Sequence, residues 1–167
     1  ANHPKHLGVL NAVAERAGWG RPAPAGVHRG LAQAMGFGSY VAACAEVSVS
    51  RDGTLKIHRI VAATDPGHAV NPQQIEAQVE GSFAYGLSAA LYGECTVKDG
   101  RIEQANFDTY RILRMDEMPR VETIVMPSGA ASLWIETSPG WPESCTAWMP
   151  FLIRLRKTRL RCPGLQA

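Results

Sequence analysis

"FGSYVAACAEVSVSRDGTLKIHRIVAATD", residues 37–65, predicts the central unit of the fold. It contains two strand-like runs on either side of an Asp-Gly pair, a strong signal for a β-hairpin. Alternation with more polar residues predicts that the first run buries one face, through Val41, Ala45, Val47 and Val49. The second run supplies Ile57, Ile60 and Val61 to the same sheet.

A long helix is predicted to follow this hairpin, starting at "NPQQIEAQVEG", residues 71–81. Asn71 can cap the free N–H groups of the first turn, and Pro72 suits the first helical position because it has no N–H to leave unpaired. The spacing predicts a helix to Tyr92 with one apolar stripe, made of Ile75, Val79, Phe83, Gly86 and Ala90.

The flanking segments complete an α+β pattern. Residues 4–19 predict a short amphipathic helix through Leu7, Leu10, Val13 and Ala14, and residues 20–26 read as a linker. A second hairpin is predicted around Asp99-Gly100, and "VETIVMPSG", residues 121–129, can supply one more strand. The expected fold is an antiparallel sheet with a long helix packed on one face.

Composition is that of an ordinary folded domain. The chain has 167 residues, of which 46% are hydrophobic and 19% charged. No apolar run approaches the roughly 18 residues of a membrane helix, and no signal peptide is apparent. Before residue 130 the chain is nearly neutral and shows no basic surface that would suggest nucleic acid. Four widely spaced cysteines predict neither a zinc site nor a disulfide framework. We therefore expect a soluble chain; the absence of an initiator methionine suggests a piece of something longer, and the compartment stays open between cytoplasm and periplasm.

Three residues of the long helix are unusual choices. Gly81 and Gly86 each cost about 1 kcal/mol of helix stability relative to alanine. Tight packing on the sheet would explain them, and so would the close approach of a ligand. Gln78 is either a solvated surface amide or a group that hydrogen-bonds the amide edge of a heterocycle. Spacing alone leaves both questions open.

The run "DPGHAVNPQQIEAQVEGSFAYGLSAALYGE", with residues 39–65 before it and "NFDTYRILRMDEMP" after it, resembles the molybdopterin-binding large subunits of the xanthine dehydrogenase and aldehyde oxidase family. Within that family it is most similar to the isoquinoline 1-oxidoreductase type. The resemblance covers about residues 3–129, and it implies that Gln78 hydrogen-bonds the pterin of the cofactor. Ala77 stands where the family often has glycine.

The resemblance also implies an activity and partners. Such enzymes hydroxylate N-heterocycles or oxidise aldehydes with water as the oxygen source, and pass electrons to iron-sulfur clusters on another domain or a small subunit. The chain is then part of an oxidoreductase, and its implied partners are the iron-sulfur small subunit and the remainder of the large subunit. We expect the chain alone to be inactive, because half a pocket neither encloses a pterin nor excludes water.

The last part of the chain departs from the family. A Gly-Glu-Pro-Gly segment with the catalytic glutamate is expected shortly after Pro127, Ser128 and Gly129, but none is present. Glu136 and Glu143 have the wrong neighbours, so no catalytic residue is assigned. We therefore divide the chain into residues 1–129, the C-terminal portion of a molybdopterin-binding domain, and residues 130–167, an atypical tail. A reading-frame change would account for this tail, and a membrane-surface or nucleic-acid-binding extension is the alternative.

A second function class stays open beside the enzyme. The chain can be a non-catalytic α+β interaction module that self-associates through a surface once buried against the rest of a subunit. The histidines at positions 3, 6, 58 and 68, and Asp65, are candidate ligands or bases, but solvated or turn-forming roles fit their spacing better. "DPGH", residues 65–68, is predicted to be a turn into the long helix.

Overall fold

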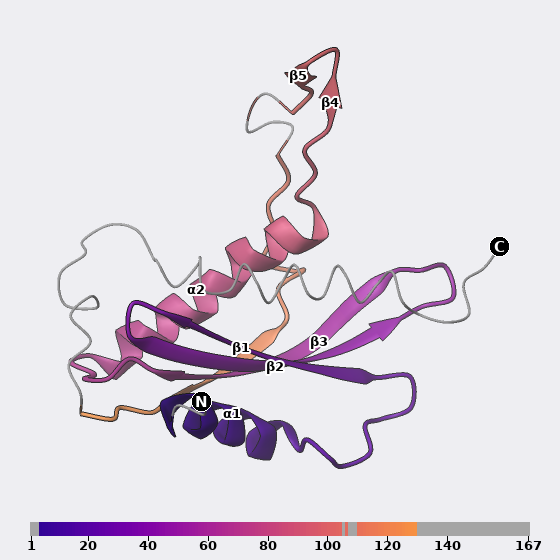
Figure 1. Ribbon diagram of the computed structural model, residues 1–167. Helices are drawn as coiled ribbons and strands as arrows, with labels where there is room; N and C mark the ends of the chain where they lie inside the picture. Colours follow the sequence, from indigo (N-terminus) through magenta and orange to yellow (C-terminus); the bar gives the residue numbers. More distant parts are fainter. Residues whose placement is uncertain (1–3, 105, 107–109, 130–167) are drawn as a thin grey trace.

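The computed structural model describes residues 4–104, 106 and 110–129, which form two helices and six strands (Figure 1). In chain order these elements are α1 (Pro4–Ala17), β1 (His28–Gly36), β2 (Ser39–Val49), β3 (Leu55–Asp65), α2 (Pro72–Leu91), β4 (Val97–Lys98), β5 (Arg101–Ile102) and β6 (Arg120–Val125). Both predicted helices, both predicted hairpins and the predicted last strand are present. Neither helix among the described residues is long and apolar enough to cross a membrane.

The main sheet has the strand order β1-β2-β3-β6. Its first three strands are antiparallel, and β2 and β3 are the predicted hairpin around Asp52-Gly53. β6 pairs with β3 in parallel, because the chain returns through α2 before it enters the sheet again. The α+β class is confirmed, with one parallel pair at one edge of an otherwise antiparallel sheet.

The edge strand β1 is a feature that the sequence pattern did not predict. It joins β2 through a two-residue turn in which Phe37 has φ 49° and Gly38 has φ 82°. Such left-handed pairs match the twist of a hairpin. The strand itself is only half buried and carries Arg29, Gly30 and Gln33, so its hydrophobic alternation is weak.

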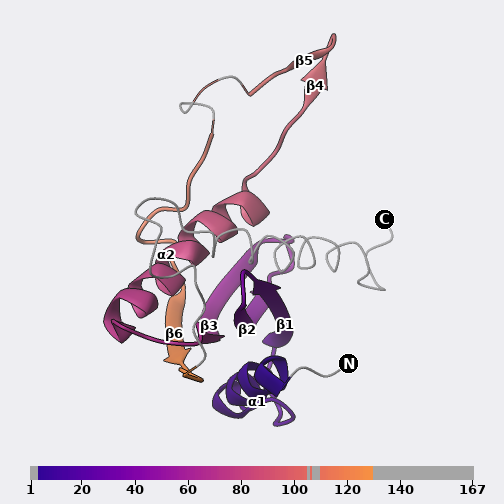
Figure 2. The ribbon, with the colours of Figure 1, turned by 60° about the vertical axis from the view of Figure 1, so that its left-hand side comes forward.

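Helices cover both faces of the sheet, α2 on one side and α1 on the other (Figures 1 and 2). Alternate strand residues therefore enter two separate cores: Val41, Ala43, Ala45, Ile60 and Ala62 pack with α2, and Ala42, Cys44, Val61 and Ala63 pack with α1. The prediction of one buried face for residues 41–49 was wrong, because a strand covered on both sides reads as a continuous apolar run.

The sheet-facing residues of the two helices differ in how well they were predicted. In α1 the buried residues are Val9, Val13 and Ala17. Of the predicted apolar face, Val13 is buried and Leu10 packs against the core, whereas Leu7 is 48% exposed, so the prediction was right only in part. In α2 the predicted stripe is confirmed, since Ile75, Val79, Phe83 and Gly86 are buried. The Asn71 side chain accepts a hydrogen bond from the backbone N–H of Gln74 at 3.3 Å, as expected of an N-cap.

Helix α2 ends where Gly93 turns the chain away. A methyl group added at Gly93 would lie 2.4 Å from the backbone oxygen of Ala89, and the Gly93 N–H already donates to the carbonyls of Ser88 and Ala89. The end of the helix thus depends on a residue without a side chain.

We expect Gly93→Ala to destabilise the chain by about 1 to 2 kcal/mol, because overpacking against backbone is relieved only by moving the helix end. Urea denaturation measures the change in unfolding free energy. Gly8→Ala is the matched control, since a methyl group there meets nothing within 4 Å; an equal or smaller loss at Gly93 would contradict the close contact.

Candidate functional site

The side of α2 that faces away from the sheet carries an uninterrupted exposed surface, which we call the outer strip. It consists of Gln74, Ala77, Gln78, Gly81 and Tyr85. These residues share one face of the helix because they recur every three or four positions. Three of them are glutamine or tyrosine, and the two between them are alanine and glycine. The strip therefore offers hydrogen-bonding groups around nearly bare backbone.

Gln78 is the third of the five residues of the outer strip along the helix, and it is exposed. Within the described part of the chain no hydrogen-bond partner of its side-chain amide is found. The amide offers two donor hydrogens and one acceptor oxygen, and Tyr85, 63% exposed, lies two helical turns further along the same face. The predicted site residue is thus available to a ligand or to another part of a protein.

The structure separates the two interior glycines. Gly86 is buried against the sheet, where tight packing explains it. Gly81 is exposed, and a methyl group added there would meet nothing within 4 Å. Packing inside the described chain therefore does not explain Gly81, and the open space above it leaves its backbone accessible next to Gln78.

One end of the outer strip is closed by the segment of residues 110–118. Ser88, one turn beyond Tyr85, donates to the carbonyl of Ala84 at 2.6 Å and accepts from the N–H of Leu113 at 2.8 Å. Tyr92 donates to Glu117 at 2.9 Å, and Glu117 also accepts from the N–H of Arg114 at 2.9 Å. The last turn of α2 is thereby covered.

The protonation states in this segment support the same contacts. Burial, followed by the hydrogen bond to Glu117, raises the pKa of Tyr92, so its hydroxyl stays a donor. The backbone N–H of Arg114, and then Tyr92, lower the pKa of Glu117, so its carboxylate stays an acceptor. The guanidinium of Arg111 lies 4.1 Å from the centre of the Tyr92 ring. The segment is held to the helix by groups that keep these states at neutral pH.

The other end of the strip lies next to a turn organised by Asp65, which is buried. Its carboxylate accepts from the N–H of Gly67 at 2.8 Å and from the hydroxyl of Ser128 at 2.9 Å. The N–H of Gly129 donates to the carbonyl of Gly67 at 3.0 Å. These bonds tie together the ends of the parallel strands β3 and β6 just before α2 begins. The predicted turn-forming role of Asp65 is confirmed.

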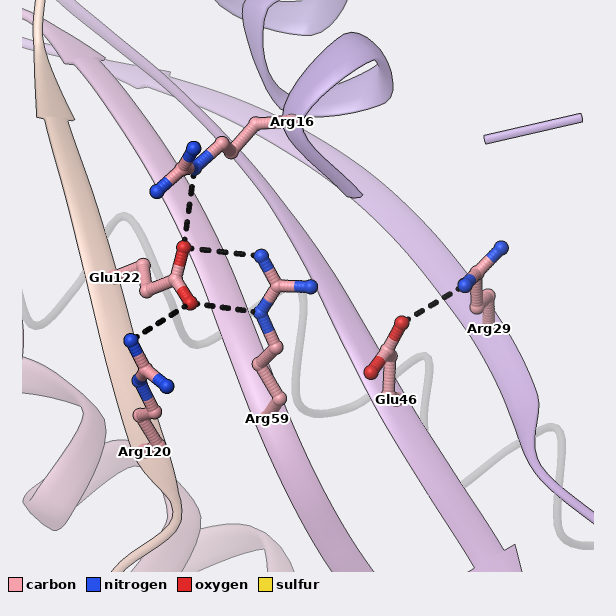
Figure 3. A network of polar contacts seen from close by, with 6 residues as sticks. All are labelled: Arg16, Arg29, Glu46, Arg59, Arg120 and Glu122. Carbon is pink, nitrogen blue, oxygen red and sulfur yellow. Dashed lines mark hydrogen bonds and ion pairs between the residues drawn. The ribbon is translucent and has the colours of Figure 1, made fainter. Parts of the chain in front are cut away.

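The opposite face of the sheet carries a row of alternating charges on adjacent strands, which we call the charge row (Figure 3). It runs from Arg29 through Glu46 and Arg59 to Glu122, with Arg16 and Arg120 also at Glu122. Arg59 donates to both oxygens of Glu122, at 2.9 and 3.0 Å, and these bonds are the main reason why the pKa of Glu122 is lowered.

The charge row fastens α1 rather than forming a reactive centre. Arg16 of α1 donates to Glu122 at 3.1 Å, and Arg29 donates to the carbonyls of Gly18 and Arg21 just beyond the end of α1. Both carboxylates of the row are paired with arginine. The thiol of Cys44, buried under α1, has its pKa raised chiefly by desolvation and is not a nucleophile.

The remaining candidates from the sequence do not assemble into a site. The ring of His6 packs edge-on against Tyr40 at 4.7 Å, the imidazole of His58 hydrogen-bonds the Ser48 hydroxyl at 2.7 Å, and His68 is exposed. Among residues 4–104, 106 and 110–129 no three His, Cys, Asp or Glu side chains are arranged to hold a metal ion. His3, Glu136, Glu143 and the whole tail lie outside the described residues.

Three features of the site were not predicted. Tyr85 belongs to the outer strip, and its spacing of seven residues from Gln78 was a usable signal. The bonds from Ser88 to Leu113 and from Asp65 to Ser128 join residues far apart in the sequence. No local pattern reports contacts of that kind.

Comparison with known proteins assigns a family to this architecture. The profile of the molybdopterin cofactor-binding domain matches residues 19–119. Isoquinoline 1-oxidoreductase subunit beta of Brevundimonas diminuta is 34% identical over 139 residues, which is 78% of this chain and 18% of that subunit. The membrane-bound aldehyde dehydrogenase [pyrroloquinoline-quinone] of Gluconacetobacter polyoxogenes is 28% identical over 130 residues, 74% of this chain and 17% of that protein. The chain thus spans less than a fifth of the length of these relatives.

Solved structures share the fold at lower sequence identity. The Cu,Mo-CO dehydrogenase in its carbon monoxide reduced state superposes with a TM-score of 0.58 at 21% identity, over 77% of this chain and 17% of that one. Quinoline 2-oxidoreductase from Pseudomonas putida 86 gives 0.55 at 18% identity, over 69% of this chain and 15% of that one. The arrangement of sheet and helices described above therefore recurs inside much longer chains.

Proposed function

Because this chain belongs to the molybdopterin cofactor-binding domain family, we propose that it forms one wall of a molybdopterin pocket, with the outer strip of α2 as the contact surface. The observation that carries the proposal is the exposed amide of Gln78, which has no partner among the described residues, beside the open backbone of Gly81. A surface of this kind is incomplete as a pocket, because ligand sites are concave and enclose most of the ligand.

The residues present fit such a group. A pterin ring has an amide-like edge, which the donor and acceptor of Gln78 can match. Above Gly81 none of the side chains that the structure describes stands in the way of a flat ring approaching the helix. Residues 110–118 close the strip beyond Tyr85, so a ring on this surface has a boundary at one end.

The chain's own contribution is to hold and orient the cofactor. When bound, the cofactor supplies the two-electron oxidation chemistry of a molybdenum hydroxylase, and protein residues position it and exclude water. Gln78 holds one edge of the ring system, and Asp65 holds the Gly67 N–H and the Ser128 side chain in place beside the start of α2. No catalytic residue is assigned to the described part of the chain.

The activity proposed for the complete protein is hydroxylation of N-heterocycles or oxidation of aldehydes with water as oxygen source. The names of the two relatives, an isoquinoline oxidoreductase subunit and an aldehyde dehydrogenase, support this substrate class. The remainder of the large subunit and an iron-sulfur small subunit are the proposed partners, and the isolated chain is proposed to be inactive. Family membership does not favour the second reading, a self-associating module without a cofactor.

We also keep the proposed division of the chain at Gly129. Residues 1–129 contain the whole family match, and residues 130–167 are proposed to be a tail of different origin. The coding DNA tests this division: a shift of one or two bases after that point should restore a Gly-Glu-Pro-Gly segment.

Molybdenum analysis tests the proposed function. The isolated chain is compared with a chimeric subunit, in which residues 4–129 replace the matching segment of the Brevundimonas isoquinoline 1-oxidoreductase subunit beta. We call this chimera the reconstituted subunit. We expect molybdenum and pterin in the reconstituted subunit and little in the isolated chain. A folded reconstituted subunit without molybdenum, or a stable metal-free oligomer of the isolated chain, would count against the pocket and for the interaction module.

Gly81→Ala should separate stability from cofactor binding. An exposed helical glycine replaced by alanine gains about 1 kcal/mol, and the added methyl group meets nothing within 4 Å in the described part of the chain. We therefore expect the isolated chain to become more stable in urea, while the reconstituted subunit retains less molybdenum because the methyl group occupies the space of the ring. If Gly81→Ala raised the stability of the isolated chain and of the reconstituted subunit and left the molybdenum content of the latter unchanged, nothing would approach the helix at this point.

A further inference from the structure

A short two-stranded ribbon, β4 and β5, extends away from the rest of the domain in both views (Figures 1 and 2). We call residues 96–103 the arm. Among the described residues its strands pair only with each other, and residues 97–103 are all exposed. Two-stranded ribbons in isolation are at best marginally stable in water.

The arm has two chemically different faces. Val97 lies directly opposite Ile102, and Lys98 lies opposite Arg101. Opposed residues share a face and neighbouring residues alternate, so an apolar pair occupies one face and a basic pair the other. Val97 is 68% exposed and Ile102 is 57% exposed. Burying these two apolar side chains against another surface would be favourable.

The shape of the arm is set by its own sequence. Asp99 and Gly100 turn the chain with φ of 50° and 75°, as a two-residue hairpin turn requires. At the base, the Thr96 N–H donates to the Gln104 side chain at 2.9 Å, and the Glu103 N–H donates to the Thr96 carbonyl at 3.0 Å. The chain therefore presents Val97 and Ile102 at a defined place outside its own core.

We propose that the apolar face of the arm docks on the part of the large subunit that lies outside this chain. That part is large, because this chain matches only 18% of the length of its relative. Its docking surface would be an apolar recess for Val97 and Ile102, while Lys98 and Arg101 stay in water. This inference rests on the proposed function only in that the chain works as one part of a longer subunit.

The size of the arm decides between this occupant and a second copy of the chain. Stable complexes between separate proteins bury roughly 1,200 Å² or more in total, far above what two side chains offer. Within one polypeptide the chain connection supplies a high effective concentration, so a small contact suffices. Two exposed aliphatic residues are thus adequate for docking within a subunit and inadequate for a dimer.

Trypsin cleavage measures how accessible the arm is, because trypsin cuts after Lys98 and Arg101 on its basic face. In the isolated chain we expect trypsin to cleave the Arg101–Ile102 bond rapidly. Mass spectrometry of samples taken over time measures the rate. In the reconstituted subunit the same bond should be cut about tenfold more slowly, since cleavage tracks the population of the open form. Val97→Thr with Ile102→Thr, which keeps β-branched shapes, should restore the fast rate.

Lys98→Gln is the matched control on the other face and should leave the protection at Arg101 unchanged. Equal cleavage rates in the isolated chain and the reconstituted subunit would overturn the proposal, as would slow, concentration-dependent cleavage of the isolated chain, which indicates a second copy. If the reconstituted subunit does not fold, the chain is mixed with the separately produced remainder of that subunit. The proposal is overturned if trypsin cuts the Arg101–Ile102 bond in the resulting complex as fast as in the isolated chain. Molybdenum content is scored independently, so loss of the cofactor with a protected arm would count against the proposed function alone.

Discussion

Glu122→Ala is expected to lower the unfolding free energy by about 2 to 3 kcal/mol. This loss lies between that expected when a fully buried ion pair is broken and that expected for a surface ion pair. The Glu122 side chain is 15% exposed and accepts bonds from Arg59 and Arg16. Without it, guanidinium groups from α1, β3 and β6 face one another uncompensated. The measurement is urea denaturation of the isolated chain at neutral pH.

Arg120→Ala is the control for this prediction. Its guanidinium is 3.5 Å from Glu122 and its side chain is 76% exposed, so we expect a change within about 0.5 kcal/mol. If Glu122→Ala cost no more than Arg120→Ala, the charge row would not fasten α1 to the sheet.

Acid should remove the same contribution. The pKa of Glu122 is lowered in the folded chain from an ordinary value of 4.5, chiefly by the hydrogen bonds from Arg59. The folded state therefore binds the proton less readily than the unfolded state, so the stabilisation is complete above pH 4.5 and is lost as the pH falls through the folded pKa. The stability difference between wild type and Glu122→Gln should shrink over that acid range; a difference that grew on acidification would contradict the sign.

Gln78→Ala is expected to reduce the molybdenum retained by the reconstituted subunit about tenfold or more, since an unmade hydrogen bond in an enclosed site costs about 1 to 3 kcal/mol. The same change should leave the isolated chain's stability nearly unchanged, because Gln78 is exposed there and its amide has no partner in the described chain. Gln73→Ala is the matched control: Gln73 is also exposed on α2 but, five residues before Gln78, it points about 140° away from it around the helix axis.

Local signals predicted those parts of the fold that local physics decides. Asp52-Gly53 and Asp99-Gly100 marked the two hairpins, and Asn71-Pro72 marked the start of α2. β1 was missed because an edge strand with polar residues lacks alternation, and the parallel pairing of β6 depends on a crossover that no local pattern encodes. The covering of both sheet faces likewise follows from α1 packing on residues distant in sequence.

The candidate site divides in the same way. Gln78 was identified through resemblance, and its place on the solvent side of α2 agrees with a role toward something outside the described chain. The burial of Gly86 agrees with its place in the predicted apolar stripe, and Gly81, five residues earlier, lies on another side of the helix. The structure adds that a methyl group at Gly81 would meet none of the described residues within 4 Å. The bonds that close the strip at Ser88 and organise the turn at Asp65 depend on tertiary contacts.

The most direct test of a cofactor-facing outer strip is the molybdenum content of the reconstituted subunit carrying Gln78→Ala, measured beside Gln73→Ala and wild type. Molybdenum lost from the Gln78 variant alone, with urea stability of the isolated chain unchanged, is the expected result. Equal molybdenum in all three proteins would contradict it and would leave α2 as a structural helix without a ligand.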